Sequence, residues 1–90
     1  MKKEVGIVIS ACRKYCNLKQ SYMAFKLDVS VDTYANIEKG RVDINTEKLF
    51  SVAQLLGIRT HQILALAEEV LETGEYYWVP SVVKKMIRVD

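Results

Sequence analysis

Hydrophobic residues recur along this chain at intervals of three and four positions, the spacing of a helix that buries one face. The pattern predicts five helices, which we place at residues 3–16, 19–27, 31–38, 46–56 and 60–73. The fourth segment has the clearest apolar stripe, formed by Leu49, Val52, Ala53 and Leu56. A succession of short amphipathic helices predicts an all-α domain.

Polar residues and glycines mark where these helices begin and end. Ser30 and Asn45 each precede an apolar stripe, where a side-chain oxygen can accept a hydrogen bond from a free backbone N–H of the first turn. Gly40, Gly57 and Gly74 follow the third, fourth and fifth segments, and glycine adopts a left-handed helix cap without steric cost. These signals place the helix ends independently of the apolar period.

Residues 75–90 carry a weaker signal. Their apolar residues have a helical spacing, at Val79, Val82, Val83, Met86 and Ile87. Pro80 suits the first turn of a helix, whereas the β-branched residues favour a strand. The period favours a sixth helix, with a strand as the alternative.

Length and composition indicate one domain, since 90 residues of which half are hydrophobic can form one small core. No apolar run approaches the roughly 18 residues that a membrane span needs. The apolar start of the chain is interrupted by Ser10 and then by Arg13 and Lys14, and no cleavage site of small residues follows. We therefore expect a cytoplasmic protein with no membrane partner.

The charge is unevenly distributed along the chain. The net charge is only +2, but residues 1–41 hold eight Lys and Arg against four Asp and Glu. Residues 42–74 hold two against five, so the excess of cations lies with the first three helices. A local excess of this kind fits a nucleic-acid footprint, although an uneven solvated surface would have the same composition.

The residue types that carry catalysis or hold metals are sparse. Cys12 and Cys16 share one helix face, where a disulfide is geometrically poor, and a zinc site would have only His61 to add. Both cysteines are therefore predicted to be reduced packing residues. No paired carboxylates or nucleophile–base pattern stands out, so we predict that the protein is not an enzyme and needs no metal or cofactor.

Residues 18–40 contain two short helices joined by a tight connection. Ala24 supplies a small side chain where the two backbones must approach, and Tyr34 and Ile37 face inward. The outward positions of the second helix are Val31, Asp32, Ala35 and Asn36. An exposed N-terminal half with short side chains has the shape to enter a DNA major groove.

This segment resembles the phage repressor/Cro-like helix-turn-helix family, also called the XRE type, over about residues 5–71. The matching elements are Arg13, Leu18-x-Gln20, Met23-Ala24, Val29-Ser30, Thr33, Ile37-Glu38-Lys39-Gly40 and Leu49-x-x-Val52-Ala53-x-x-Leu56-Gly57-Ile58. The resemblance implies a five-helix lambda-repressor-like domain at residues 1–74, with 75–90 as a C-terminal extension. It also implies that the third helix reads double-stranded DNA, usually as a homodimer on a palindromic operator.

The chain departs from the family pattern at several positions. Lys19 stands where Ser or Thr usually caps the second helix, Asp28 where glycine is common, and Ile44 where proline is frequent. The outward positions of the third helix also contain no cation. These departures weaken the prediction of DNA binding but do not exclude it, because base recognition does not require a cation.

The predicted DNA contacts divide into base readers and phosphate binders. Asn36 can bond adenine through two hydrogen bonds, Asp32 can accept from cytosine, and Val31 can touch a thymine methyl group. The residues expected to reach phosphates are Gln20, Thr33, Lys39 and Arg41. Each of these predicted DNA contacts also has a structural interpretation, as a helix cap, a solvated surface residue or a charge that favours the helix dipole. By the family resemblance, Arg13 and Glu38 form a partly buried ion pair that joins the first helix to the end of the third.

The leading function is therefore a sequence-specific transcriptional regulator of the repressor, antitoxin or restriction-modification controller type. The alternative is a protein-interaction module that kept the fold and lost DNA binding. Asp32 favours this alternative slightly, and Tyr76-Tyr77-Trp78 could anchor a protein partner or pack on the domain itself. We also expect the apolar stripe of residues 79–87 to support homodimerisation, because so small a monomer has little core left to cover it.

Overall fold

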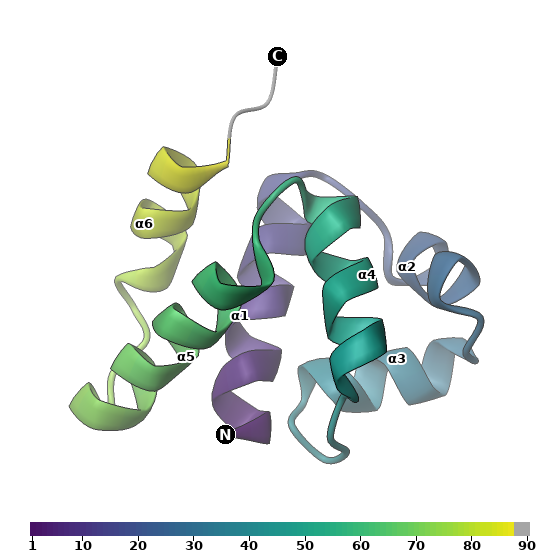
Figure 1. Ribbon diagram of the computed structural model, residues 1–90, viewed down its shortest axis with the longest axis horizontal. Helices are drawn as coiled ribbons and strands as arrows, with labels where there is room; N and C mark the ends of the chain where they lie inside the picture. Colours follow the sequence, from purple (N-terminus) through teal and green to yellow (C-terminus); the bar gives the residue numbers. More distant parts are fainter. Residues whose placement is uncertain (88–90) are drawn as a thin grey trace.

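The computed structural model describes residues 1–87, and these residues form six α-helices and no strand (Figure 1). The helices are α1 (Lys2–Tyr15), α2 (Gln20–Leu27), α3 (Val31–Glu38), α4 (Thr46–Leu56), α5 (Thr60–Thr73) and α6 (Val79–Met86). The all-α fold and the five predicted helices are confirmed, with ends that differ by at most one residue. The end of the chain also forms a helix, so the strand alternative is wrong for residues 79–86.

Helix α1 lies at the centre of the fold and packs against α3, α5 and α6. Its residues Val8, Ile9 and Cys12 are fully buried. Each fully buried aliphatic side chain contributes about 1.5–3 kcal/mol relative to an exposed one. In Figure 1, α2 and α3 lie on one side of α1, and α5 and α6 lie on the other. The central helix therefore supports both halves of the molecule.

Helix α6 belongs to the hydrophobic core. Val79 and Val83 are fully buried, and Ile87 is almost fully buried. Ile7 and Ala11 of α1 line the same groove as Val79, so α6 covers an apolar side of the central helix. The expectation that a ninety-residue monomer leaves this stripe uncovered is therefore wrong. Because the stripe is covered within the monomer, it gives no reason to expect dimerisation through the C-terminal extension. Residues 1–74 share one hydrophobic core with α6.

The predicted helix caps are present. The Ser30 hydroxyl accepts a hydrogen bond from the backbone N–H of Thr33 at 3.0 Å. The side-chain oxygen of Asn45 accepts one from the N–H of Lys48 at 2.8 Å. Asp28 ends α2 with a φ of 56°, a left-handed conformation that is less costly for glycine than for aspartate. The departure from the family pattern at this turn thus carries a local conformational cost.

Two glycines bring α1 into contact with the end of α3. A Cβ atom on Gly6 would lie 2.6 Å from the carbonyl oxygen of Ile37, closer than real Cβ atoms approach. A Cβ on Gly40 would lie 2.5 Å from the Cα of Lys3, and Gly40 has a φ of +73°. The position of α3 on the domain therefore depends on glycine at both sites, one of which, Gly6, had no signal in the apolar period.

Candidate nucleic-acid interface

Helices α2 and α3 form a two-helix unit with a buried inner side. Met23, Ala24 and Leu27 of α2 are buried, as are Tyr34 and Ile37 of α3. The turn is closed by a hydrogen bond of 3.1 Å from the N–H of Val29 to the carbonyl of Ala24. Because five buried side chains hold the two helices, the outer face of α3 is presented on a fixed support.

The outer face of α3 carries the predicted base readers. Val31, Asp32 and Thr33 are exposed in its first turn, and Ala35 and Asn36 are half-buried one turn further on. The Thr33 hydroxyl oxygen accepts a hydrogen bond of 2.9 Å from the Ser30 hydroxyl, so Thr33 also belongs to the helix cap. The three base candidates therefore share one face, with Asn36 less exposed than the other two.

The cationic candidates lie where α3 ends. Lys39 and Arg41 are exposed, and the N–H of Arg41 donates to the carbonyl of Asn36 at 2.9 Å. The close approach at Gly40 also places the backbone of Lys3 beside this loop, and the Lys3 side chain is exposed. Cations from α1 and from the loop after α3 therefore occupy one region, which the spacing in the sequence did not indicate.

Arg13 and Glu38 form the ion pair that the family resemblance implies. The Nε of Arg13 lies 2.6 Å from Oε2 of Glu38, and its Nη2 donates to Oε1 at 3.1 Å. Only 11% of the Arg13 side chain and 6% of the Glu38 side chain are exposed. The remaining Nη1 donates to the carbonyl of Leu18 at 2.9 Å, just before α2. This one guanidinium thus joins α1, the start of α2 and the end of α3.

Two further side chains bind the same carboxylate. The Gln20 side-chain N–H donates to Oε1 of Glu38 at 3.0 Å, and the Tyr34 hydroxyl donates to Oε2 at 2.5 Å. Burial alone would raise the pKa of Glu38, but hydrogen bonds from Arg13, Tyr34 and Gln20 outweigh it and hold the pKa below its usual value. Burial, followed by the bond to Glu38, raises the pKa of Tyr34 well above its ordinary range. At neutral pH, the Glu38 carboxylate therefore stays ionised and the Tyr34 hydroxyl stays neutral.

These two hydrogen bonds to Glu38 were not predicted from the sequence. Gln20 was predicted to reach phosphate, but its side-chain amide faces inward to Glu38 in the free protein. Tyr34 was predicted only as a buried residue, although its spacing of four from Glu38 places the two side chains on one helix face. That spacing was the available signal for Tyr34, whereas no spacing rule links Gln20 to Glu38.

The structure assigns no reactive role to the cysteines. Cys12 is fully buried and unpaired with Cys16, and burial, together with its neighbour Cys16, raises the pKa of its thiol to about 12. A thiol with that pKa is protonated at neutral pH and is a poor nucleophile. Within residues 1–87, no three His, Cys, Asp or Glu side chains are grouped so that they could hold a metal ion.

The part of the chain described here contains no single helix that is both long and apolar enough to cross a membrane. Helices α4 and α5 would pass that test only together, and they are bent by 101° relative to each other.

The fold and this face define a class of protein. A buried two-helix unit presents a capped helix with short exposed side chains, and cations flank that helix at its C-terminal end. This arrangement is the helix-turn-helix of DNA-binding proteins, in which the second helix enters the major groove.

Comparisons with known proteins agree with this class. The family model described as helix-turn-helix matches residues 9–63, more than half of the chain, and the chain belongs to that family. The protein is therefore a DNA-binding transcriptional regulator of the XRE-type helix-turn-helix group. No curated protein sequence is significantly similar to it.

Its fold is shared by solved structures that include two of the clp gene regulator ClgR from Corynebacterium glutamicum. The first has a TM-score of 0.77 and 22% sequence identity, over 81% of this chain and 78% of the ClgR chain. The second has a TM-score of 0.72 and 23% identity, over 78% and 91% of the two chains. Over about four fifths of the chain, the helical fold is thus one that a known gene regulator also adopts.

Proposed function

We propose that the protein binds a specific operator by inserting α3 into the major groove. Val31, Asp32 and Asn36 then face base edges, where Val31 meets a thymine methyl group, Asp32 a cytosine amine and Asn36 an adenine. The observation that carries the proposal is the capped first turn of α3, which is exposed while the opposite side of the same helix is buried. A helix supported in this way can enter the groove without losing its packing.

The phosphate contacts come from residues that border α3. Lys39 and Arg41 are exposed cations at its C-terminal end, and the Thr33 hydroxyl is exposed at its start. Gln20 keeps one of its two amide N–H groups for a phosphate while the other donates to Glu38. A phosphate bound to Gln20 would then be linked to Arg13 through Glu38, which accepts hydrogen bonds from both side chains. Phosphate contacts of this kind fix the register of the protein on DNA.

The protein acts in the cytoplasm as a homodimer on a palindromic site. Two copies of α3 that read equivalent half-sites would lie about 34–36 Å apart, one turn of B-DNA. A short α3 with few base contacts supports this proposal, since doubling the contacts raises the affinity for DNA. The structural neighbours are described as regulators of clp genes, which supports a role in transcription.

The proposal is tested by the salt dependence of binding to the DNA upstream of the protein's own gene, measured by gel shift. We expect a shift whose association constant falls with salt, at a log–log slope of about −0.9 for each phosphate contact. Absence of any shift at low salt, for the wild type and for Asp32→Asn alike, would refute it. Asp32→Asn is the matched variant because it removes the charge and keeps the size of the side chain.

A second candidate function is a protein-interaction module on the same fold. It is favoured by the exposure of Tyr76 and Tyr77, which the packing alternative would have buried; Trp78 alone of the three is half-buried. Exposed tyrosines are frequent anchors at protein interfaces. This function would be supported if the gel shift failed while the protein remained folded.

A further inference from the structure

The outer face of α2 carries two exposed aromatic side chains. Phe25 is 79% exposed, more than any other large hydrophobic residue in the described part of the chain, and Tyr22 is 41% exposed. The two residues lie three positions apart on the side of α2 opposite its buried residues. Helix α2 lies at the edge of the molecule against α3 and α4 (Figure 1), so the aromatic pair faces away from both helices. One exposed aromatic residue would be ordinary, but an adjacent pair forms an apolar patch.

This patch is flanked by lysines. Lys19 and Lys26 are both exposed, and residues 18–27 contain no Asp or Glu. The Nζ of Lys26 lies 5.7 Å from the centre of the Tyr22 ring, a cation–π contact that fixes the two side chains relative to each other. The outer face of α2 therefore has an apolar centre and a positive rim.

The stability of α2 does not account for either lysine. Lys19 stands at the N-cap, where the end of the helix is partly positive, and its side chain makes no capping hydrogen bond. A cation is favourable at the C-terminal end, but Lys48 of α4 already serves that end, because its Nζ donates to the carbonyl of Leu27 at 2.9 Å. The charge at residue 19 thus opposes the helix dipole, and the charge at residue 26 adds to a contact that another lysine makes.

From these observations we infer that the outer face of α2 docks a partner protein through an acidic amphipathic helix. The apolar stripe of that helix covers Tyr22 and Phe25, and its Asp and Glu side chains meet Lys19 and Lys26. The same face of a second copy is a poor occupant, since the lysines would meet one another across the two-fold axis. A DNA backbone would neutralise the lysines but leave the Phe25 ring in water.

The size of the face sets the strength of the contact. A fully buried aromatic side chain removes about 150–250 Å² from water. The two rings therefore supply only part of the roughly 800 Å² per partner that a standard interface buries. The lysines mainly raise the rate of association. We expect a reversible complex with a dissociation constant in the micromolar range, formed on the side of α2 that is turned away from α3. One molecule can then hold the partner and DNA together.

Fluorescence anisotropy with a labelled synthetic peptide tests the docking. The peptide is an amphipathic helix with Leu at positions spaced by three and four and Glu at most others, and a second peptide has Lys in place of Glu. The whole protein should bind the acidic peptide at least about tenfold more tightly than the basic one. Absence of saturable binding at about 1 mM acidic peptide would overturn the inference.

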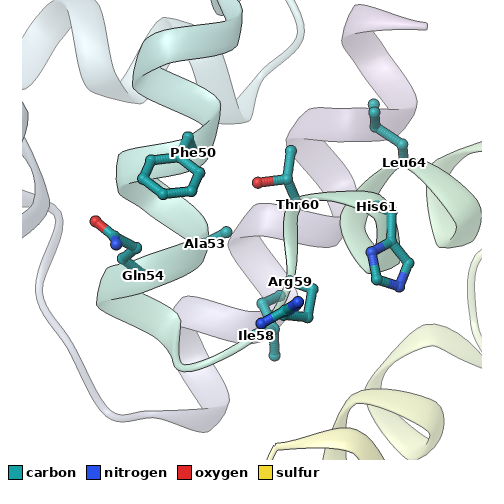
Figure 2. A pocket seen from close by; sticks show the side chains of 8 residues that line it. All are labelled: Phe50, Ala53, Gln54, Ile58, Arg59, Thr60, His61 and Leu64. Atoms are coloured by element: carbon teal, nitrogen blue, oxygen red, sulfur yellow. The ribbon is translucent and has the colours of Figure 1, made fainter.

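Phe25→Gln locates the contact, because it removes the ring and keeps a good helix former. It should weaken binding of the acidic peptide at least about tenfold. The matched control is Phe50→Gln, since Phe50 of α4 is 55% exposed and borders a hollow of about 580 Å³ between α4 and α5, shown in Figure 2. Both variants should melt within about 4 °C of the wild type. Binding that Phe25→Gln leaves intact, or that both changes weaken alike, would overturn the inference.

Lys19→Glu combined with Lys26→Glu tests the positive rim. This double variant should prefer the basic peptide to the acidic one, the reverse of the wild-type preference. Lys84→Glu combined with Lys85→Glu is the matched control, because it makes the same change of charge at exposed positions of α6. The control should keep the wild-type preference. An α2 double variant that still prefers the acidic peptide would contradict the assigned partner chemistry.

Gel shifts with DNA separate this face from the proposed DNA interface. Phe25→Gln should keep the DNA affinity of the wild type within about twofold, because Phe25 lies on the side of α2 away from α3. A variant that loses DNA binding and keeps the peptide would assign the face to DNA and overturn the inference. If the wild type binds the acidic peptide through Phe25 and binds no DNA, the inference stands and only the operator proposal fails.

Discussion

Replacing Glu38 with Gln would remove a negative charge and one of two acceptor oxygens at the junction of α1, α2 and α3. The carboxylate accepts four hydrogen bonds, two from Arg13 and one each from Gln20 and Tyr34. A carboxamide offers a single acceptor oxygen, and its NH₂ group would face donors. At least one of the four donors would therefore lose its partner, and the guanidinium of Arg13 would lose its counter-charge.

The expected magnitude follows from burial. With 11% and 6% of the two side chains exposed, the pair lies close to the buried limit, where removing one partner costs about 3–5 kcal/mol. A comparable surface pair is worth only about 0–1 kcal/mol. A domain of this size has a total stability of roughly 5–15 kcal/mol, so Glu38→Gln should leave the protein close to unfolding.

Urea denaturation at pH 7 measures this cost, with Glu68→Gln on the exposed face of α5 as the control. The control should change the free energy of unfolding by no more than about 0.5 kcal/mol. A further variant, Arg13→Met with Glu38→Leu, replaces both charges and should be less destabilised than Glu38→Gln. A cost below about 1 kcal/mol for Glu38→Gln would refute the reasoning, since the pair would then behave as a surface pair.

The same group predicts the direction of the pH dependence. The pKa of Glu38 is lower in the folded protein than in the unfolded chain. Its contribution to stability is therefore complete above the ordinary glutamate value of about 4.3, and it is lost as the pH falls through the folded-state value. In Glu38→Gln, this part of the acid sensitivity should be absent.

Three further changes test the packing and the charge of the DNA-binding side. Gly6→Ala should destabilise the fold by about 1–3 kcal/mol in urea denaturation, because the new methyl group meets the backbone carbonyls of Ile37 and Glu38; an unchanged midpoint would contradict the close approach. Val83→Ala should cost about 1.5–3 kcal/mol in the same assay, whereas a neutral result would mean that α6 is not part of the core. Arg41→Ala should weaken binding to all DNA sequences alike and reduce the salt slope by about one, and Lys85→Ala, an exposed cation on α6, should not.

The helices could be predicted from the sequence because two local signals agree. The apolar period marks the buried face, and Ser30, Asn45 and Gly57 mark the ends through interactions within a few residues. The packing of α6 was harder to predict, since its apolar stripe shows that the helix buries one face but not which part of the protein covers that face. That depends on how much apolar surface α1 leaves open after α3 and α5 have packed, which is a property of the whole fold.

The site was only partly predictable for a similar reason. The outward face of α3 follows from its helical period, so the sequence alone predicts that Val31, Asp32 and Asn36 lie on one face. The inward bond of Gln20 depends on a residue eighteen positions away, and no local rule specifies it. The approach of Gly6 to the end of α3 is likewise a contact between distant segments, and the presence of a glycine inside a helix does not by itself predict such a contact.

Selection of binding sites from random double-stranded DNA, performed in parallel with the wild type and Asp32→Ala, tests sequence reading by α3 most directly. The account predicts that the wild type enriches a palindrome with half-sites one helical turn apart. Asp32→Ala should enrich the same palindrome with relaxed preference at one symmetric pair of positions, a loss of about 1–3 kcal/mol of discrimination at each. Failure of the wild type to enrich any sequence, or an identical motif from both proteins, would contradict the placement of Asp32 against a base.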